Sequence, residues 1–464
     1  MLLARTAAVA LALLAPLAAA AQATPAPEAP PPMGERLPPE AAPAPSPQRP
    51  RRYQIERIEI RGLVRTHESE VRRHLLVVEG DLLDDQDVLL SRLRLLQLGW
   101  FSRVDTRVER GSERGLVTLV FEVVERNTLI ITDLILGTTP PQPAYAGLGL
   151  SQQNFLGLGL GLSGAFVYGD PDRFAVRGSF FAPDLAFANL PRLVAGLSVL
   201  WLRGEEFNCS DPSCDAYRGR YDQAPRVRYE RVGGEVDLGF RPGPFERLVF
   251  GYRGEHVHAV DVGVPQGPVP FHFTGDSVVS ALTGSYELDT RDDFFLPRDG
   301  WRGLGQITFA SKILGGSYEY SRYLLQVESG FALFRLPLRF QGALGAVQGD
   351  APFFDRFYGA DFMYFAVGPA VGRALEINYS TDSRYDAFVA MGGVEWAFPL
   401  WSRGAFLRRG YASLGARAVY SSAQPGAGRT GISKIPYSFD AALRLDTPVG
   451  VFNLSLGYIL DFVL

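Results

Sequence analysis

The feature that most constrains this chain is an alternation of apolar and polar residues from about residue 129 to the end. Phe452, Leu454 and Leu456, for example, alternate with Asn453. A period of two places successive side chains on opposite faces of a β-strand. About fifteen such segments follow one another, each ~10–14 residues long. The fold must therefore accommodate an apolar face on all of these strands at once.

Two architectures satisfy this pattern. A soluble sandwich buries its apolar faces against a second sheet, whereas a membrane barrel turns them toward lipid. Only a closed barrel satisfies every backbone group of a sheet within a bilayer. The export signal described below, the length of the segments and the aromatic residues near their ends favour the barrel. We predict a mainly β fold with a transmembrane antiparallel barrel of about 14–16 strands. An even number is expected because bacterial single-chain barrels normally have one, and 16 is favoured over 14 by the resemblance described below.

Composition excludes other classes. After the N-terminus no run of about 18 apolar residues occurs, so helical membrane spans are not expected. The net charge of −4 argues against a broad nucleic-acid surface, and we expect no nucleic-acid partner. The 50 glycines fit many strands joined by tight turns.

The first 50 residues are predicted to lie outside any folded domain. Residues 1–23 resemble a secretory signal peptide, with Arg5, an apolar stretch and the small-x-small site Ala21-Gln22-Ala23. Residues 24–50 form a Pro/Ala-rich linker that cannot build a core and is predicted to be disordered, although partner docking is an alternative. In an exported chain Cys209 and Cys214 can oxidise, and a small loop disulfide is preferred over metal or redox chemistry.

Residues 51–127 predict a small soluble α+β domain. A short strand contains Ile58 and Ile60. A helix with Thr66 as its cap follows, and then a second helix capped by Asp84 or Asp85. Leu89, Leu93 and Leu96 would form the buried face of the second helix, which Gly99 ends. Two strands across residues 111–115 complete a β-α-α-β-β order.

Four motifs of this domain resemble a POTRA (polypeptide-transport-associated) domain. They are Ile58-x-Ile60-x-Gly62, Glu79-Gly80-Asp81, Leu98-Gly99-Trp100-Phe101 and Val123-Val124-Glu125-Arg126. The resemblance implies that the domain captures unfolded chains in the periplasm, in part by pairing a client strand with a sheet edge.

Residues 128–464 resemble the barrel of the BamA/TamA superfamily of outer-membrane assembly proteins. Gln153-Asn154-Phe155-Leu156-Gly157-x-Gly159 is similar to the family's early hairpin turn. The most specific stretch, residues 289–300, is similar to its mid-barrel turn. In that turn Pro297 and Gly300 would close the loop while its charges stay in water. The turn residues that we single out are Asp289, Arg291, Asp292, Pro297 and Gly300.

The resemblance also implies a long loop that folds into the barrel lumen. Phe357-Tyr358-Gly359 and Val367-Gly368-Pro369 are similar to its flanks. Between them the family carries Arg-Gly-Phe or Arg-Gly-Tyr, whose arginine pairs with lumen acids and holds the loop inside. This chain departs from that pattern. The candidate residues of this loop are Tyr358, Gly359, Met363, Tyr364, Phe365, Gly368, Pro369 and Arg373, the last as a replacement for the missing arginine.

The C-terminus resembles the signal by which outer-membrane barrels are recognised for insertion. Its candidate residues are Ser455, Gly457, Leu460, Phe462 and Leu464. The family usually ends in Phe, and it usually has one more strand after the turn at residues 446–450. The closing seam of the barrel is therefore left open at this stage.

No catalytic, cofactor or metal site is predicted. Residues 159–164 fit a dinucleotide fingerprint, but no parallel βαβ unit surrounds them. His256 and His258 share one strand face and lack an evident third metal ligand. Lumen carboxylates such as Asp446 are interpreted as solvated charges. We therefore expect a protein that is not an enzyme and that needs no cofactor.

The resemblance implies insertion, assembly or translocation of proteins at the bacterial outer membrane, with client chains passed from the periplasmic domain to the barrel seam. The expected partners are outer-membrane lipids, unfolded outer-membrane or secreted proteins, and periplasmic or lipoprotein accessory subunits. Two alternatives stay open: a passive channel or structural barrel whose small domain docks a partner, and a secretion pore dedicated to one exoprotein.

Overall fold

The computed structural model describes residues 53–139, 142–170, 173–187, 190–207, 226–262, 275–292, 296–334, 336–358, 385–401, 407, 409–422, 437–447 and 450–460. The regions predicted as signal peptide and linker, and both cysteines, lie outside these residues. Among the described residues, no helix is long and apolar enough to cross a membrane.

The small domain has the predicted β-α-α-β-β order. Its elements are β1 (Gln54–Arg61), α2 (Glu68–Arg73), α3 (Asp85–Gln97), β2 (Phe101–Arg110) and β3 (Leu116–Glu125). The sheet order is β1-β3-β2, in which β3 pairs parallel to β1 and antiparallel to β2. Because β3 is central, both β1 and β2 are sheet edges.

The core of the small domain is apolar, but one helix face differs from the prediction. Leu89 is exposed, and the buried residues of α3 are Val88, Ser91, Arg94 and Leu95. Residues 88, 91 and 95 also follow helical spacing, so the apolar pattern fitted two faces and the packing selected the other one. Leu96 packs only against the margin of the core.

Of the two predicted helix caps, one is present and the other is not. Asp84 caps α3 by accepting a hydrogen bond from the Gln86 backbone amide at 2.8 Å, as predicted. Thr66 does not cap α2, whose N-cap is His67 without a side-chain cap. The hydroxyl of Thr66 instead accepts a hydrogen bond from Asn154 Nδ2 at 2.9 Å, and this longer-range contact replaces the local cap.

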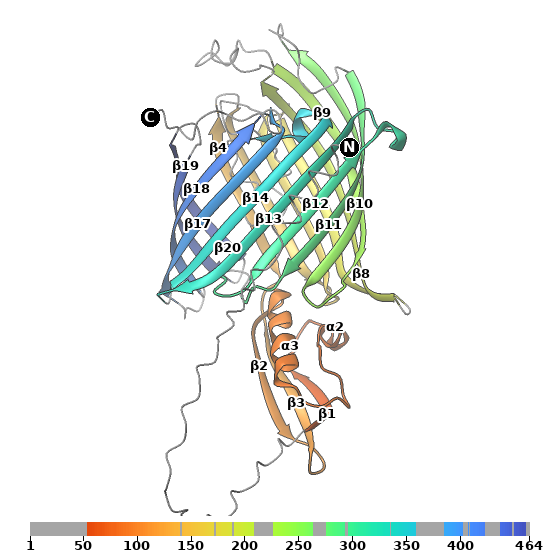
Figure 1. Ribbon diagram of the computed structural model, residues 1–464, viewed down its shortest axis with the longest axis vertical. Coiled ribbons are helices and arrows are strands. Elements are labelled where there is room, and N and C mark those ends of the chain that lie inside the picture. Colours follow the sequence, from red (N-terminus) through yellow and green to blue (C-terminus); the bar gives the residue numbers. More distant parts are fainter. Residues whose placement is uncertain are drawn as a thin grey trace, which may run out of the picture. The chain divides into compact units, whose positions relative to one another are not determined.

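Most of the remaining described chain is one antiparallel sheet that curves into a barrel (Figure 1). Its fifteen strands are β4 (Leu129–Thr139), β5 (Gln142–Phe155), β6 (Leu160–Asp170), β7 (Arg173–Phe187), β8 (Leu190–Phe207), β9 (Arg226–Phe240), β10 (Glu246–Val262), β11 (Gly275–Asp289), β12 (Trp301–Ala310), β13 (Glu319–Leu333), β14 (Leu336–Asp350), β17 (Phe388–Trp401), β18 (Arg409–Ser422), β19 (Tyr437–Thr447) and β20 (Gly450–Leu460). The short elements are η3 (Lys312–Leu314), η4 (Phe353–Asp355), β15 (Phe357–Tyr358) and β16 (Tyr385–Asp386).

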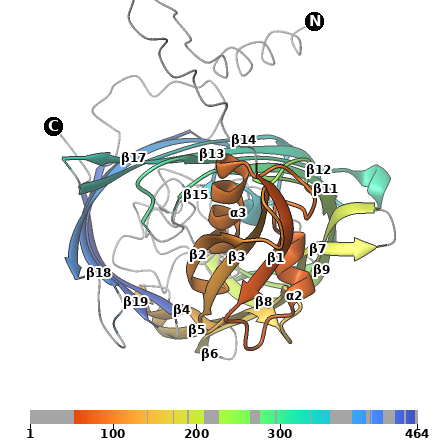
Figure 2. The ribbon, with the colours of Figure 1, turned by 90° about the horizontal axis from the view of Figure 1, so that it is seen from below.

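The alternation in the sequence becomes the two faces of this barrel. Apolar side chains such as Phe250 and Ile307 are exposed by 57% and 54%, which identifies the outer face. Charged side chains one residue out of phase, such as Arg231 and Glu255, are buried inside. A soluble protein buries these two classes the other way round. The arrangement confirms the barrel, and β15 lies inside its ring of strands (Figure 2).

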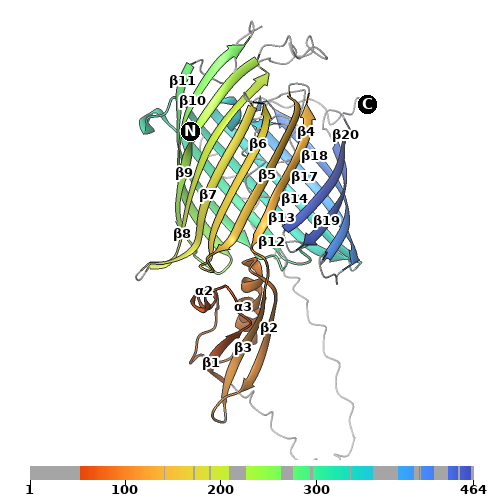
Figure 3. The ribbon, with the colours of Figure 1, turned by 180° about the vertical axis from the view of Figure 1, so that it is seen from behind.

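The ends of the large sheet are β4 and β20, which lie side by side (Figure 3). Within the described residues no backbone ladder joins them, and the sheet has fifteen strands rather than the favoured sixteen. In an antiparallel sheet with an odd strand number, the first and last strands run in the same direction. β4 and β20 are therefore parallel to each other and cannot form the antiparallel pairing of the rest of the sheet.

Candidate functional site

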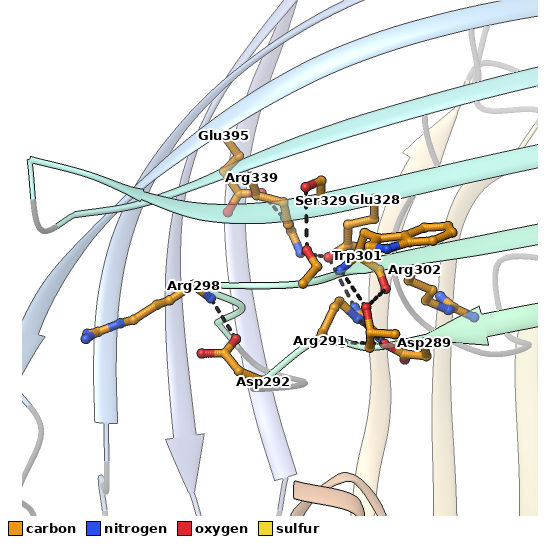
Figure 4. A network of polar contacts seen from close by, with 12 residues as sticks. Asp289, Arg291, Asp292, Arg298, Trp301, Arg302, Glu328, Ser329, Arg339 and Glu395 are labelled. Carbon is orange, nitrogen blue, oxygen red and sulfur yellow. Dashed lines mark hydrogen bonds and ion pairs between the residues drawn. The ribbon is translucent and has the colours of Figure 1, made fainter. Parts of the chain in front are cut away.

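The turn between β11 and β12 is the first candidate region. Its backbone is held from within: Asp292 Oδ1 accepts hydrogen bonds from the amides of Arg298 at 2.9 Å and Asp299 at 3.1 Å (Figure 4). Gly300 has a φ of +89°, and a Cβ there would lie 2.3 Å from the Thr290 carbonyl oxygen. The turn therefore requires glycine at this position. Pro297 packs against Gly330 of β13.

Arg291 in this turn corrects the prediction that its charges stay in water. The residue is 2% exposed, and its guanidinium donates to both oxygens of Asp289 at 2.9 and 2.7 Å (Figure 4). It also donates to Glu328 Oε1 of β13 at 3.1 Å. A guanidinium can serve two carboxylates because its five N–H groups point in several directions. The turn is thereby fixed to the inner wall of the barrel.

The same chain of charges continues along the inner wall. Arg339 of β14 lies 3.6 Å from Glu328 and pairs with Glu395 of β17. Glu395 also accepts a hydrogen bond from Arg444 of β19 at 2.7 Å. Alternating guanidinium and carboxylate groups thus connect β11, β13, β14, β17 and β19. We call Arg291, Glu328, Arg339, Glu395 and Arg444 the ionic belt.

A second cluster lies where the chain leaves β14 and enters the lumen. Asp355 of η4 is 7% exposed, and its Oδ1 accepts a hydrogen bond from Arg253 Nη1 of β10 at 3.0 Å. Its Oδ2 accepts from Arg253 Nη2 and from the hydroxyl of Tyr320 of β13. Both carboxylate oxygens are therefore satisfied by groups of the barrel wall.

Aromatic side chains surround this carboxylate. The guanidinium of Arg231 lies 4.1 Å from the centre of the Phe354 ring, a cation–π arrangement. The Phe353 and Tyr229 rings meet edge to face at 4.9 Å. A cavity of about 110 Å³ adjoins the cluster, lined in part by Arg177, Arg322 and Gln306. A polar cavity of this size has room for a few waters.

The early hairpin motif of the barrel contacts a motif of the small domain. The indole Nε1 of Trp100 donates to the Gln153 carbonyl at 3.1 Å, and the His67 amide donates to the Gly157 carbonyl at 3.0 Å. Asn154 bonds Thr66, as described above, and also accepts from the Gly159 amide at 2.8 Å. Two separate stretches that carried the family resemblance thus form one contact.

Glu125 belongs to the motif at residues 123–126, and its hydrogen bonds give that motif a structural role. Its carboxylate accepts hydrogen bonds from the backbone amides of Val64 at 3.1 Å and Thr66 at 2.8 Å. Partial burial raises the pKa of Glu125, but these amides outweigh that effect and hold its pKa below the ordinary value. Gly62, with φ of +98°, allows the chain to pass the Val123 carbonyl, which a Cβ would approach to 2.1 Å.

The sequence interpretation does not identify three groups that form ion pairs, namely Asp446, Arg253 and Asp355. Asp446, interpreted as a solvated lumen charge, is buried and lies 3.1 Å from Arg409 and 3.7 Å from Arg126. Arg253 and Asp355 were not singled out. A signal for Arg253 is present in the sequence, because Arg253 and Glu255 lie one residue out of phase with Phe250 and Tyr252 of the same strand. Asp355 lies outside any strand pattern and offered no such signal.

Most residues predicted for the lumen loop and the C-terminal signal cannot be placed. Gly359, Met363, Tyr364, Phe365, Gly368, Pro369, Arg373, Phe462 and Leu464 lie outside the described residues, as do Cys209 and Cys214. The backbone of Tyr358 belongs to β15, and the backbones of Ser455, Gly457 and Leu460 belong to β20.

The two strand histidines have an acidic neighbour that the sequence did not reveal. Asp276 Oδ1 lies 2.8 Å from His258 Nδ1 and 3.4 Å from His256 Nε2. All three side chains are exposed on the outer face. Among the residues that the structure describes, no group of three or more His, Cys, Asp or Glu side chains is arranged to hold a metal ion.

Comparison with known proteins gives two matches to family models. The Omp85 superfamily domain matches residues 154–463. The POTRA model, described as a surface antigen variable number repeat, matches residues 53–126. The ionic belt and the lumen cluster both lie in the first match, and β1 to β3 lie in the second.

Two curated relatives are proteins named outer membrane protein assembly factor BamA. The one from Neorickettsia risticii (strain Illinois) is 25% identical and covers 59% of this chain and 34% of that protein. The one from Nitratidesulfovibrio vulgaris (strain Hildenborough) is 24% identical and covers 66% and 36%. The chain thus spans about a third of the length of these relatives.

Two solved structures share the fold. BamA from Haemophilus ducreyi lacking POTRA domains 1–3 has a TM-score of 0.50 at 16% identity, covering 88% of this chain and 81% of that one. CdiB from Escherichia coli has a TM-score of 0.57 at 10% identity, covering 88% and 73%. At these identities the likeness concerns the architecture alone.

Proposed function

The chain belongs to the Omp85 superfamily, and we propose that it inserts, assembles or translocates proteins at the bacterial outer membrane. In this proposal the barrel spans the membrane, and the small domain and the linker lie in the periplasm. The client is an unfolded outer-membrane or secreted protein, which the small domain binds first and the barrel seam receives. Accessory subunits would dock on the small domain.

The observation that carries the proposal is the seam between β4 and β20. A strand edge presents a row of N–H and C=O groups, and leaving them unpaired in lipid costs several kcal/mol per group, on the order of 2–7. Both edges run in the same direction, so one strand of opposite direction would be antiparallel to each of them. An incoming client strand satisfies this geometry.

The small domain offers one further edge. The outer side of β1 is occupied, because the Ile55 amide donates to the Asp81 carbonyl at 2.8 Å and the Ile55 carbonyl accepts from the Gly80 amide at 2.7 Å. β2 forms the other edge of the sheet, and an extended peptide can add to it by main-chain hydrogen bonds. Such pairing does not depend on the client's side chains at every position. A capture site of this kind suits a protein that handles many unfolded chains.

Site-specific photocrosslinking tests the seam. A crosslinking amino acid at Leu134 of β4 and another at Leu456 of β20 are expected to trap a radiolabelled barrel substrate during its insertion. The matched control is Ile307 of β12, which has an outward side chain but whose strand is paired on both sides by β11 and β13. Equal trapping at Ile307 would mean that clients meet only the outer surface, and the seam proposal would fail.

Reconstitution separates the proposal from its rivals. A urea-unfolded barrel protein is diluted onto liposomes with or without the full chain, and insertion is followed by protease protection. Faster insertion supports assembly activity. Ion conductance without any effect on insertion would favour the passive channel, whereas transport of one co-encoded exoprotein with no barrel client would favour the dedicated secretion pore.

A further inference from the structure

Residues 351–358, which follow β14, are packed inside the barrel. Ala351, Phe353, Phe354 and Phe357 are each at most 2% exposed and belong to one buried cluster inside the barrel. These residues are not part of the strand wall, because η4 and β15 follow the end of β14. Something must hold this short stretch in place against its conformational entropy.

The wall is shaped to receive the stretch. At Gly345 of β14 a Cβ would come within 2.4 Å of the Phe357 ring, so only glycine leaves room for that ring. The guanidinium of Arg322 covers Phe357 at 4.7 Å from the ring centre. On the neighbouring strands Arg231 is itself held by Glu255, with hydrogen bonds of 3.0 and 2.8 Å, which positions it over Phe354.

The negative charge of this contact lies on the segment inside the barrel, and the donors lie on the barrel wall. The acid, Asp355, lies on the inward segment, whereas Arg253 and the Tyr320 hydroxyl lie on the wall, and Arg253 Nη2 also donates to the Tyr320 hydroxyl at 2.9 Å. Two wall groups, which also bond each other, therefore share the one carboxylate of Asp355. Removing a single member leaves the others buried with unsatisfied donors, which costs more than one exposed contact.

We propose that Asp355 is the positioning residue that anchors the start of this loop in the barrel lumen, through Arg253 and Tyr320. The polarity is opposite to that implied by the family resemblance, in which a loop arginine pairs with lumen acids. This inference stands whether or not the chain acts on protein clients.

Cysteine labelling tests the anchor in the full chain, folded in detergent, with Cys209 and Cys214 replaced by serine. The reporter is Ala351→Cys, because Ala351 is 1% exposed and cysteine is close to alanine in size. Asp355→Asn is expected to raise its rate of maleimide labelling about tenfold or more, since hydrogen bonds to charged groups are among the strongest in proteins. Tyr320→Phe removes one hydroxyl and is expected to give a smaller rise.

Three controls define the outcome. Asp350→Asn, an exposed acid at the end of the same strand, should leave the labelling rate unchanged. Ile313→Cys, 93% exposed, should label rapidly in every variant. Ala310→Cys, buried in the same cluster on β12, reports general loosening of the barrel. Equal acceleration at Ala310 and Ala351 would overturn the anchor, as would unchanged labelling at Ala351. If Asp355→Asn does not fold, Tyr320→Phe decides by the same two criteria.

Discussion

The small domain and the barrel solve the problem of burial in opposite ways. The domain hides residues such as Leu119 and Phe121 completely and leaves ion pairs such as Arg61–Glu109 on its surface. The barrel exposes Phe250 and Ile307 and hides the ionic belt. The two regions therefore have opposite patterns of apolar and charged residues inside and outside. The mean hydropathy of the chain, +0.02, averages these patterns and describes neither region.

This difference indicates which substitutions should destabilise each region most. In the domain the free energy of folding comes mainly from apolar area removed from water. In the barrel the outer face stays apolar to match lipid, while the inner face depends on charges that are acceptable only when each has a partner. Substitutions of the same chemical kind should therefore have different effects in the two regions.

The largest effect is expected inside the barrel. Glu395→Ala leaves Arg339 and Arg444 without their shared carboxylate and should destabilise the barrel by about 3–5 kcal/mol. The measurement is the temperature at which the folded band is lost on semi-native gels. Glu319→Ala is the control, because Glu319 pairs with exposed Lys312 at 3.8 Å and such exposed pairs contribute about 1 kcal/mol or less. Equal shifts for both variants would contradict the importance of the belt.

The next effect concerns the apolar core of the small domain. Leu119→Ala should lower the stability of this domain by about 3 kcal/mol, from lost burial and the cavity left behind. Hydrogen exchange of β1 and β3 in the full chain measures it. Val108→Ala, half-exposed on β2, should change exchange little. If the two substitutions behaved alike, the domain would not be organised around the described core.

A charge on the outer face of the barrel should have a smaller effect. Ile307→Lys places an ammonium against lipid and should cost about 2 kcal/mol, depending on depth. Unfolding in urea with lipid bilayers present gives the value. Ile313→Lys, in η3 outside the strands, is the matched control and should have no measurable effect. A null result at Ile307 would contradict its contact with lipid.

The smallest effect is a dependence of the small domain on pH. Burial, and then the charge of Arg94, holds the pKa of His74 well below its ordinary value. The unfolded chain takes up this proton near pH 6.5 while the folded one does not, so stability falls on acidification, by about 1 kcal/mol between pH 7 and 5.5. Hydrogen exchange of α2 and α3, corrected for intrinsic rates, should show this loss. The His74→Gln variant should lack it.

Sequence patterns predicted the architecture because both periods reflect local geometry. The order of elements in the small domain follows from spacing, caps and glycine breaks, and the two faces of the barrel strands follow from the period of two. The β11–β12 turn is located by its resemblance to the mid-barrel turn of the family. The sequence does not predict that Val88 rather than Leu89 is buried on α3, nor that Thr66 bonds Asn154. Both depend on what the segment packs against. The partners of Asp355 and Asp446 cannot be found from the sequence for the same reason, since they lie 35 to 320 residues away along the chain.

The shared direction of β4 and β20 also determines on which sides of the membrane the two ends of the barrel sheet lie. β4 begins next to the small domain, since only residues 126–128 separate it from β3. After an odd number of antiparallel crossings, β20 finishes at the opposite surface. With the small domain in the periplasm, an epitope inserted after Leu460 would be displayed to antibodies on intact cells, whereas one inserted in the β2–β3 turn, between Glu113 and Arg114, would stay hidden until the cells are permeabilised.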